Sequence, residues 1–88
     1  MTDDVVDQLR SEITAVDREI LAAVNRRLEL VEQLKEHKES VGVAFVDPER
    51  ERRLIEELRA ENRGPLSDEG AEQLFQEILA LVKRELAR

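Results

Sequence analysis

Apolar residues recur along the first half of the chain at alternating spacings of three and four, the pattern of a helix that packs along its length. The series is Val6, Leu9, Ile13, Val16, Ile20, Ala23, Leu30 and Leu34. Neither Pro nor Gly interrupts the stretch from Thr2 to Val41. We therefore predict one long helix which, at about 1.5 Å per residue, is on the order of 55 Å long. A second stripe, which indicates a second neighbour, consists of Leu21, Val24, Leu28 and Val31.

Two shorter helices are predicted after a connecting loop at residues 40–47. Asp47 and Pro48 supply an N-cap and a first-turn proline, so the second helix should begin there and run to about Asn62. Its small apolar face consists of Leu54, Ile55 and Leu58. The third helix should begin after Ser67 and continue almost to the C-terminus. The stripe expected to form its core face is Leu74, Phe75, Ile78, Leu79, Val82 and Leu86.

Length and composition favour a single all-α domain, residues 1–88, that depends on a second copy of the chain. The sequence is 41% hydrophobic and 40% charged, without Cys, Trp or Tyr, which is typical of helical bundles. A compact monomer of this length has a diameter of only roughly 30 Å, so its own chain is too small to cover the predicted long helix. We therefore expect an intertwined homodimer with three helices per protomer.

Several functional classes are disfavoured by composition. The lack of cysteine excludes thiolate metal sites, and the single His37 has no companion ligands, so we expect no metal and no cofactor. The N-terminus lacks the basic and apolar segments of a signal peptide, and no stretch is apolar enough to span a bilayer, so we expect a cytoplasmic protein. A net charge of −7, with bases interleaved among acids, disfavours nucleic acid and membranes as partners.

The strongest candidate for chemistry is Arg27, which stands where the apolar repeat calls for a hydrophobic residue. Lys38 follows eleven residues later, about 20° from a whole number of turns and roughly 16 Å along the axis, so the two side chains share a face. Together they are suited to hold a small anion. Arg10 lies about 25 Å from Arg27 on the same helix and points elsewhere, so an antiparallel partner would have to supply it.

Each of these residues also has an ordinary structural explanation. Arg10 and Lys38, taken singly, would be solvated helix cations. Arg27 would pair with an acid of a partner chain and set the register of the dimer. Asp47 suffices as an N-cap, and the charged residues after it would be exposed in the first turn of an ordinary helix. Only the joint spacing of the series favours a binding site.

The series resembles the all-helical chorismate mutases over nearly the whole chain. The residues that carry the resemblance are Leu9-Arg10, Asp17, Ile20-Leu21, Arg27, Leu30, Lys38 and Asp47-Pro48-Glu49-Arg50-Glu51. Residues 61–68 and the pair Leu74-Phe75 are similar to mutase domains fused to prephenate dehydratase or to the first enzyme of the shikimate pathway. The resemblance implies an intertwined dimer that converts chorismate to prephenate for phenylalanine and tyrosine biosynthesis.

The resemblance also implies a role for each candidate residue. Arg27 and the partner subunit's Arg10 would clamp the two substrate carboxylates, and Lys38 would face the breaking ether bond. The ring hydroxyl would be held by two acids, with an arginine that supports a carboxylate or orients them: Asp47, Glu51 and Arg50. This intramolecular rearrangement needs positioning and electrostatics but no nucleophile, proton transfer or metal. The loop at residues 40–47 would act as a mobile lid.

The last helix departs from the family pattern, in which Ser and, one turn later, Gln or Glu commonly complete the pocket. Counting from Leu74-Phe75 gives Val82 and Leu86 at these positions. Glu85 is adjacent to the second position but about 100° around the helix, so only a shift in register would restore it. Losing one such donor can slow an enzyme by about 100-fold.

Two alternatives therefore remain beside a simple mutase. One is a weakly active or regulatory helical module that needs an associated shikimate-pathway enzyme. The other is an isochorismate pyruvate lyase, which shares the fold and the cations of the resemblance. The arrangement Asp47-x-x-Arg50-Glu51 favours the mutase over the lyase.

Overall fold

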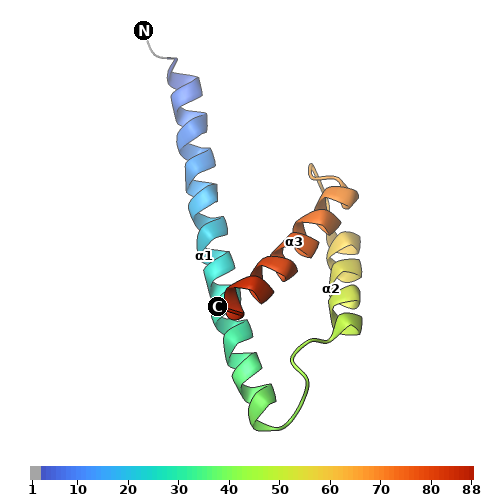
Figure 1. Ribbon diagram of the computed structural model, residues 1–88. Helices are drawn as coiled ribbons and strands as arrows, with labels where there is room; N and C mark the ends of the chain where they lie inside the picture. Colours follow the sequence, from blue (N-terminus) through green and yellow to red (C-terminus); the bar gives the residue numbers. More distant parts are fainter. Residues whose placement is uncertain (1–2) are drawn as a thin grey trace. The chain divides into compact units, whose positions relative to one another are not determined.

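The structure, a computed structural model, describes residues 3–88, which form three α-helices and no β-strand. The helices are α1 (Asp4–Ser40), α2 (Pro48–Glu61) and α3 (Asp68–Leu86), as Figure 1 shows. The all-α class is confirmed, and each helix lies close to its predicted bounds. Among the described residues, no helix is both long and apolar enough to cross a membrane.

The chain divides within α1 into two compact parts, residues 1–30 and residues 31–88, which we describe separately. In the first part, the described residues belong almost entirely to α1, and none of them is buried. Its apolar repeat is largely exposed; the side chain of Ile13, for example, is 60% accessible. The single domain inferred from the sequence stays a prediction.

The second part begins with the last turns of α1, which end in a Schellman motif. Gly42 has a φ of +72°, a left-handed conformation that glycine adopts without steric penalty. The amide of Val43 donates to the carbonyl of Lys38 at 2.9 Å, and the amide of Gly42 donates to Glu39 at 3.4 Å. These bonds satisfy carbonyls that the helix end would otherwise leave unpaired. The end of α1 is therefore defined by Gly42, and the loop of residues 41–47 starts from a fixed direction.

Helices α2 and α3 form an antiparallel hairpin whose two helices begin at the predicted caps. Asp47 and Ser67 each accept a hydrogen bond from a backbone amide three residues later, at 3.1 and 3.0 Å. Ion pairs join the helices at both ends of the hairpin. Arg59 contacts Glu72 at 2.8 Å at one end, and Lys83 contacts Glu51 at 2.7 Å at the other.

The core of this hairpin is small. Among the described residues only Ala71 and Val82, both on α3, are buried. The apolar face predicted for α2 is half-buried, as is most of the stripe predicted for α3. Leu74 is an exception, because 47% of its surface is exposed. Its place in the core stays a prediction, because the expected core is shared with a second copy of the chain, whereas within residues 31–88 α2 is the helix packed along α3.

Candidate functional site

The predicted site residues belong to both parts of the chain. Arg10 and Arg27 belong to the first part; Arg10 is exposed and Arg27 is half-buried. Within residues 3–88 neither guanidinium forms a hydrogen bond or an ion pair. The neighbouring Arg26, in contrast, lies 3.5 Å from Glu29 on the same helix. The two predicted arginines are thus cations without a carboxylate partner among the described residues, and their assembly into one site stays a prediction.

Lys38 is half-buried at the end of α1, where its side chain holds the connecting loop. Its ammonium donates to the carbonyl oxygen of Phe45 at 3.2 Å, while its own carbonyl accepts from Val43. Lys35 lies one turn earlier, with its ammonium 5.7 Å from the centroid of the Phe45 ring and 3.3 Å from the carbonyl oxygen of Leu86. Two lysines of α1 therefore fix Phe45, and with it the middle of the loop.

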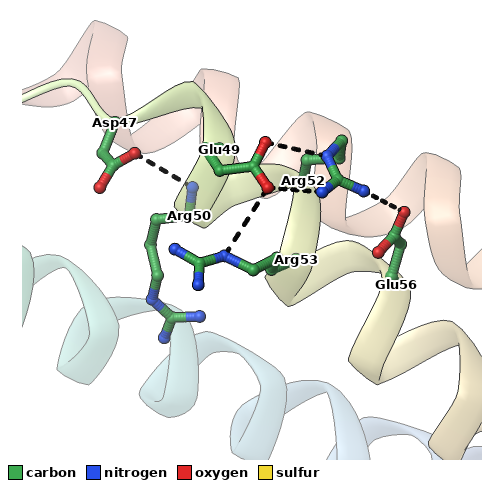
Figure 2. Close-up of polar contacts among 6 residues, drawn as sticks. All are labelled: Asp47, Glu49, Arg50, Arg52, Arg53 and Glu56. Carbon is green, nitrogen blue, oxygen red and sulfur yellow. Dashed lines mark hydrogen bonds and ion pairs between the residues drawn. The ribbon is translucent and has the colours of Figure 1, made fainter.

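Asp47 and Arg50 meet through the backbone at the start of α2. One carboxylate oxygen of Asp47 accepts from the backbone nitrogen of Arg50, not from its guanidinium. Figure 2 shows the side chain of Arg50 directed away from the ion pairs that Arg52 forms with Glu49 and Glu56. Asp47 thus acts as the N-cap, and Arg50 makes no side-chain pair within residues 3–88.

The neighbouring ion pairs on α2 form an exposed surface network. The hydrogen bonds that the Arg52 guanidinium donates to Glu49, reinforced by the charge of Glu56, raise the pKa of Arg52 above its usual value. More than half of each of these side chains is accessible to solvent. For Glu49, Arg52 and Arg53 the ordinary structural explanation, exposed charges in the first turns of a helix, therefore holds. Such i,i+3 and i,i+4 pairs support the helix modestly and indicate no ligand.

Glu51 differs from its neighbours because it faces α3. Both of its carboxylate oxygens lie within hydrogen-bonding distance of the ammonium of Lys83, at 2.7 and 3.0 Å. The sequence analysis missed Lys83, because it followed only the apolar stripe of the third helix. The available signal was helical spacing: Glu51 precedes Ile55 by one turn on α2, and Lys83 follows Leu79 by one turn on α3.

The two family positions that are apolar in this chain remain apolar in the structure. Val82 is 3% exposed, and Leu86 is half-buried. Helix α3 is regular through Leu86, and Glu85 lies 3.3 Å from Arg88. The structure therefore shows no register shift that would bring Glu85 to the position of Leu86.

A groove of about 450 Å³ runs along the hairpin, a size within the usual range of small-molecule sites. Its apolar lining includes Ile55 and Leu79, and its charged lining consists of Glu51, Arg52, Glu56, Glu72 and Lys83. Glu51 is the one predicted site residue that lines it. The groove and the predicted site therefore meet at this carboxylate.

The sequence matches the family described as chorismate mutase type II over residues 9–85. The chain belongs to this family. The match runs from Leu9, directly before Arg10, to Glu85, so it includes all the predicted site residues. The family membership inferred from the residue pattern is thus confirmed.

Known relatives of this family agree with the assignment. The chain is 34% identical over 84 residues to the T-protein of Haemophilus influenzae, covering 93% of this chain and 21% of the relative. It is 32% identical over 78 residues to the bifunctional chorismate mutase/prephenate dehydratase of Neisseria gonorrhoeae, covering 89% and 21%. The chain thus spans about a fifth of the length of these curated relatives.

Solved structures also resemble this chain. A chorismate mutase from Thermus thermophilus (Form I) superposes with a TM-score of 0.88 at 35% identity, covering 90% of this chain and 99% of that one. Form II of the Thermus protein gives the same TM-score, with 92% of each chain covered. This chain therefore has the same fold as the chorismate mutase from Thermus thermophilus.

Proposed function

We propose that this chain is a chorismate mutase, which catalyses the rearrangement of chorismate to prephenate. The observation that carries the proposal is the family match over residues 9–85, which spans the whole cationic series. The likeness to a Thermus chorismate mutase supports it, because 99% of that chain is covered at 35% identity. The curated relatives support a fusion or association with prephenate dehydratase, since two of them carry both activities in their names.

The proposed catalysis depends on positioning and electrostatics. Arg27 and Arg10 of the partner subunit bind the two carboxylates and select the folded, chair-like conformer of the substrate. Arginine is suited to this task because its guanidinium forms two parallel hydrogen bonds with a carboxylate. The reactive chair-like conformer of the substrate is rare in water. Such a clamp lowers the activation barrier of the rearrangement because it holds the bound substrate in that conformer. The lack of a carboxylate partner for Arg27 within residues 3–88 supports a role in binding an external anion.

Lys38 faces the ether oxygen of the breaking bond. Negative charge accumulates on that oxygen as the bond lengthens, so a fixed ammonium binds the transition state more tightly than the substrate. The structure supports this role, because Lys38 is half-buried and its hydrogen bond to Phe45 uses only one of three ammonium donors. The loop thereby orients the ammonium and leaves donors for the substrate.

The acids of α2 hold the ring hydroxyl in this proposal. Asp47 is the N-cap of α2 and Glu51 lies one turn later in that helix, so both carboxylates can face one ligand. Arg50 lies between them in sequence, and its guanidinium, which has no partner within residues 3–88, supports a substrate carboxylate. In this proposal the loop at residues 40–47 is the lid that orders over the substrate. It ends at the N-cap of α2, and its Phe45 carbonyl accepts from Lys38.

A homodimer completes the proposed site. The apolar repeat in residues 4–30 is exposed and includes a shallow groove lined by Leu9, Ile13 and Val16. A continuous apolar face of this kind indicates a binding partner. An antiparallel second copy would cover it and would carry its own Arg10 towards the Arg27 of the first copy.

An enzyme that depends on an associated partner is the second candidate. It is favoured by Val82 and Leu86, which leave the helix α3 side of the site without the polar pair common in the family. Without a polar donor from α3 beside Lys38, the chain would bind chorismate but convert it slowly, and a partner enzyme would accelerate the conversion. Low activity of the isolated chain that rises on adding a shikimate-pathway enzyme would favour this candidate.

The direct test is an assay of the purified chain for loss of chorismate and appearance of prephenate. We expect Arg27→Ala to lower kcat/KM at least 100-fold, since a carboxylate of the substrate would lose its charged partner. Arg26→Ala is a matched control, because Arg26 is adjacent on α1 and, within residues 3–88, pairs only with the exposed Glu29. Equal activity of the two variants would refute the site, and release of pyruvate from isochorismate would instead favour the lyase.

A further inference from the structure

The ion pair between Lys83 and Glu51 differs from the other ion pairs of residues 3–88. Most of those join residues of one helix, and only this pair and the Arg59 pairs connect α2 with α3. The side chain of Glu51 is 27% exposed, the least of any charged side chain in these pairs. Partial burial strengthens such an interaction and fixes its geometry more firmly than at an exposed site.

The position of Lys83 is also notable on α3. It directly follows Val82, which occupies the first position where the family commonly has a polar residue. Successive residues on a helix are about 100° apart, so the side chain of Lys83 lies beside the buried Val82, on the side of α3 that faces α2. Lys83 and Glu51 line the same groove as Ile55 and Leu79.

We propose that Lys83 is a positioning residue for Glu51 in the substrate site. It supplies from α3 a polar contact to the site, in a chain where Val82 and Leu86 supply none. The proposal rests on the proposed function, because Glu51 must hold the ring hydroxyl for its position to matter. Lys83 acts through Glu51 and does not touch the reacting atoms.

The chemistry of the two groups fits this role. A carboxylate offers about four lone-pair sites, and the contacts to Lys83 leave sites on both oxygens for a hydroxyl donor. A glutamate without a partner samples several rotamers, and binding the substrate would then have to select one of them. With Lys83 in place, that ordering is present before the substrate arrives. The hydroxyl contact exists in both substrate and transition state, so its loss should appear mainly in KM.

The test is a set of variants assayed with chorismate under steady-state conditions. We expect Lys83→Met, which keeps the length of the side chain but removes its charge, to raise KM about tenfold and to change kcat less than threefold. Lys83→Arg should restore KM to within about threefold, because it keeps a donor opposite Glu51. In a Glu51→Gln background, Lys83→Met should add less than a twofold effect, because the residue it positions has already lost its charge.

Arg59→Met is the matched control, because it removes both of the other ion pairs between α2 and α3, those with Glu69 and Glu72, while leaving the end of the hairpin with Glu51 unchanged. If Lys83 only stabilised the hairpin, both variants would lower Tm alike and neither would change KM selectively. We expect Arg59→Met to leave KM within twofold of wild type. Independent effects of Lys83→Met and Glu51→Gln would overturn the proposal.

The outcomes also separate this inference from the function on which it rests. An active wild type with an unchanged KM in Lys83→Met refutes the positioning role alone. A higher kcat/KM in that variant also refutes it, because Lys83 would then compete with the substrate for Glu51. A wild type that neither turns over chorismate nor gains thermal stability from a bicyclic transition-state analogue refutes the proposed function, and the role of Lys83 with it.

Discussion

Asp47 combines a structural task with a proposed catalytic one, and two substitutions can separate them. Its carboxylate caps α2 by accepting from the backbone nitrogen of Arg50 at 3.1 Å. We expect Asp47→Ala to destabilise the chain by about 1 kcal/mol, the usual effect of losing an N-cap, and Asp47→Asn to retain most of that stability. Urea denaturation measures both.

The activity of the same variants tests the second task. If Asp47 also accepts a hydrogen bond from the ring hydroxyl, then Asp47→Asn should raise KM several-fold although its stability is nearly unchanged. Wild-type kinetics in Asp47→Asn would show that capping is the whole role of this residue. Ser67→Ala is the control, because it removes the N-cap of α3, at the far end of the hairpin from Asp47.

At the scale of single residues, the sequence predicts local interactions better than contacts between distant residues. The N-caps Asp47 and Ser67 were predictable because capping is a local interaction within three residues. The partner of Glu51 was not predicted, because Lys83 lies 32 residues later and meets it only through the packing of two helices. Charged residues at helical spacing are common on solvated faces, so spacing alone does not distinguish such a pair.

At the scale of the element, the end of α1 depends on one glycine. Gly42 has a φ of +72°, and a Cβ built there has no other atom within 4 Å. The penalty of Gly42→Ala should therefore come from the backbone alone, about 1 kcal/mol in the free energy of unfolding. Gly42→Asn should be milder, because asparagine tolerates the left-handed region better than alanine.

Kinetics of the Gly42 variants would show whether this helix end also serves the site. Gly42 directs the loop whose Phe45 carbonyl accepts from Lys38. We expect Gly42→Ala to lower kcat more than Gly42→Asn does, because a displaced loop would misorient the ammonium. Equal kcat values for wild type and Gly42→Ala, with the stability loss present, would show that the loop does not position Lys38.

The helices themselves were largely predictable from the sequence, whereas the burial of their apolar faces was predictable only in part. Local signals set the ends of α2 and α3, and an uninterrupted apolar repeat indicated α1. Leu74 fits the helical stripe of α3 and is 47% exposed in the single chain, so its burial in a core shared with a second copy stays a prediction. A stripe shows which residues are able to be buried, whereas burial also requires a neighbouring element on that side.

At the scale of the whole molecule, the sequence and the structure both indicate that this chain needs a partner chain to cover its long helix. The apolar repeat of residues 4–30 is exposed, as Ile13 illustrates, and Arg27 has no carboxylate partner within residues 3–88. The apolar repeat and the unpaired arginine are features of a single chain, whereas a dimer interface forms between two chains. The quaternary structure is therefore best tested by an experiment in which the two chains differ.

Mixing two inactive variants provides that experiment. In Arg10→Ala the chain keeps Arg27, and in Arg27→Ala it keeps Arg10, so each homodimer lacks one arginine in both sites. If each site takes Arg27 from one chain and Arg10 from the other, a heterodimer has one intact site and one doubly defective site. Random reassortment makes about half of the dimers heterodimers, so about a quarter of the wild-type activity should return.

The regained activity distinguishes the possible arrangements without any further structure. If both arginines of a site came from the same chain, every site in the mixture would carry a defect, and denaturing and refolding the two variants together would restore nothing. Refolding each variant alone controls for recovery caused by the procedure. Dilution supplies an independent check, because the regained activity should fall as the dimers dissociate. Activity that returned but persisted in demonstrably monomeric protein would refute a site shared between two chains.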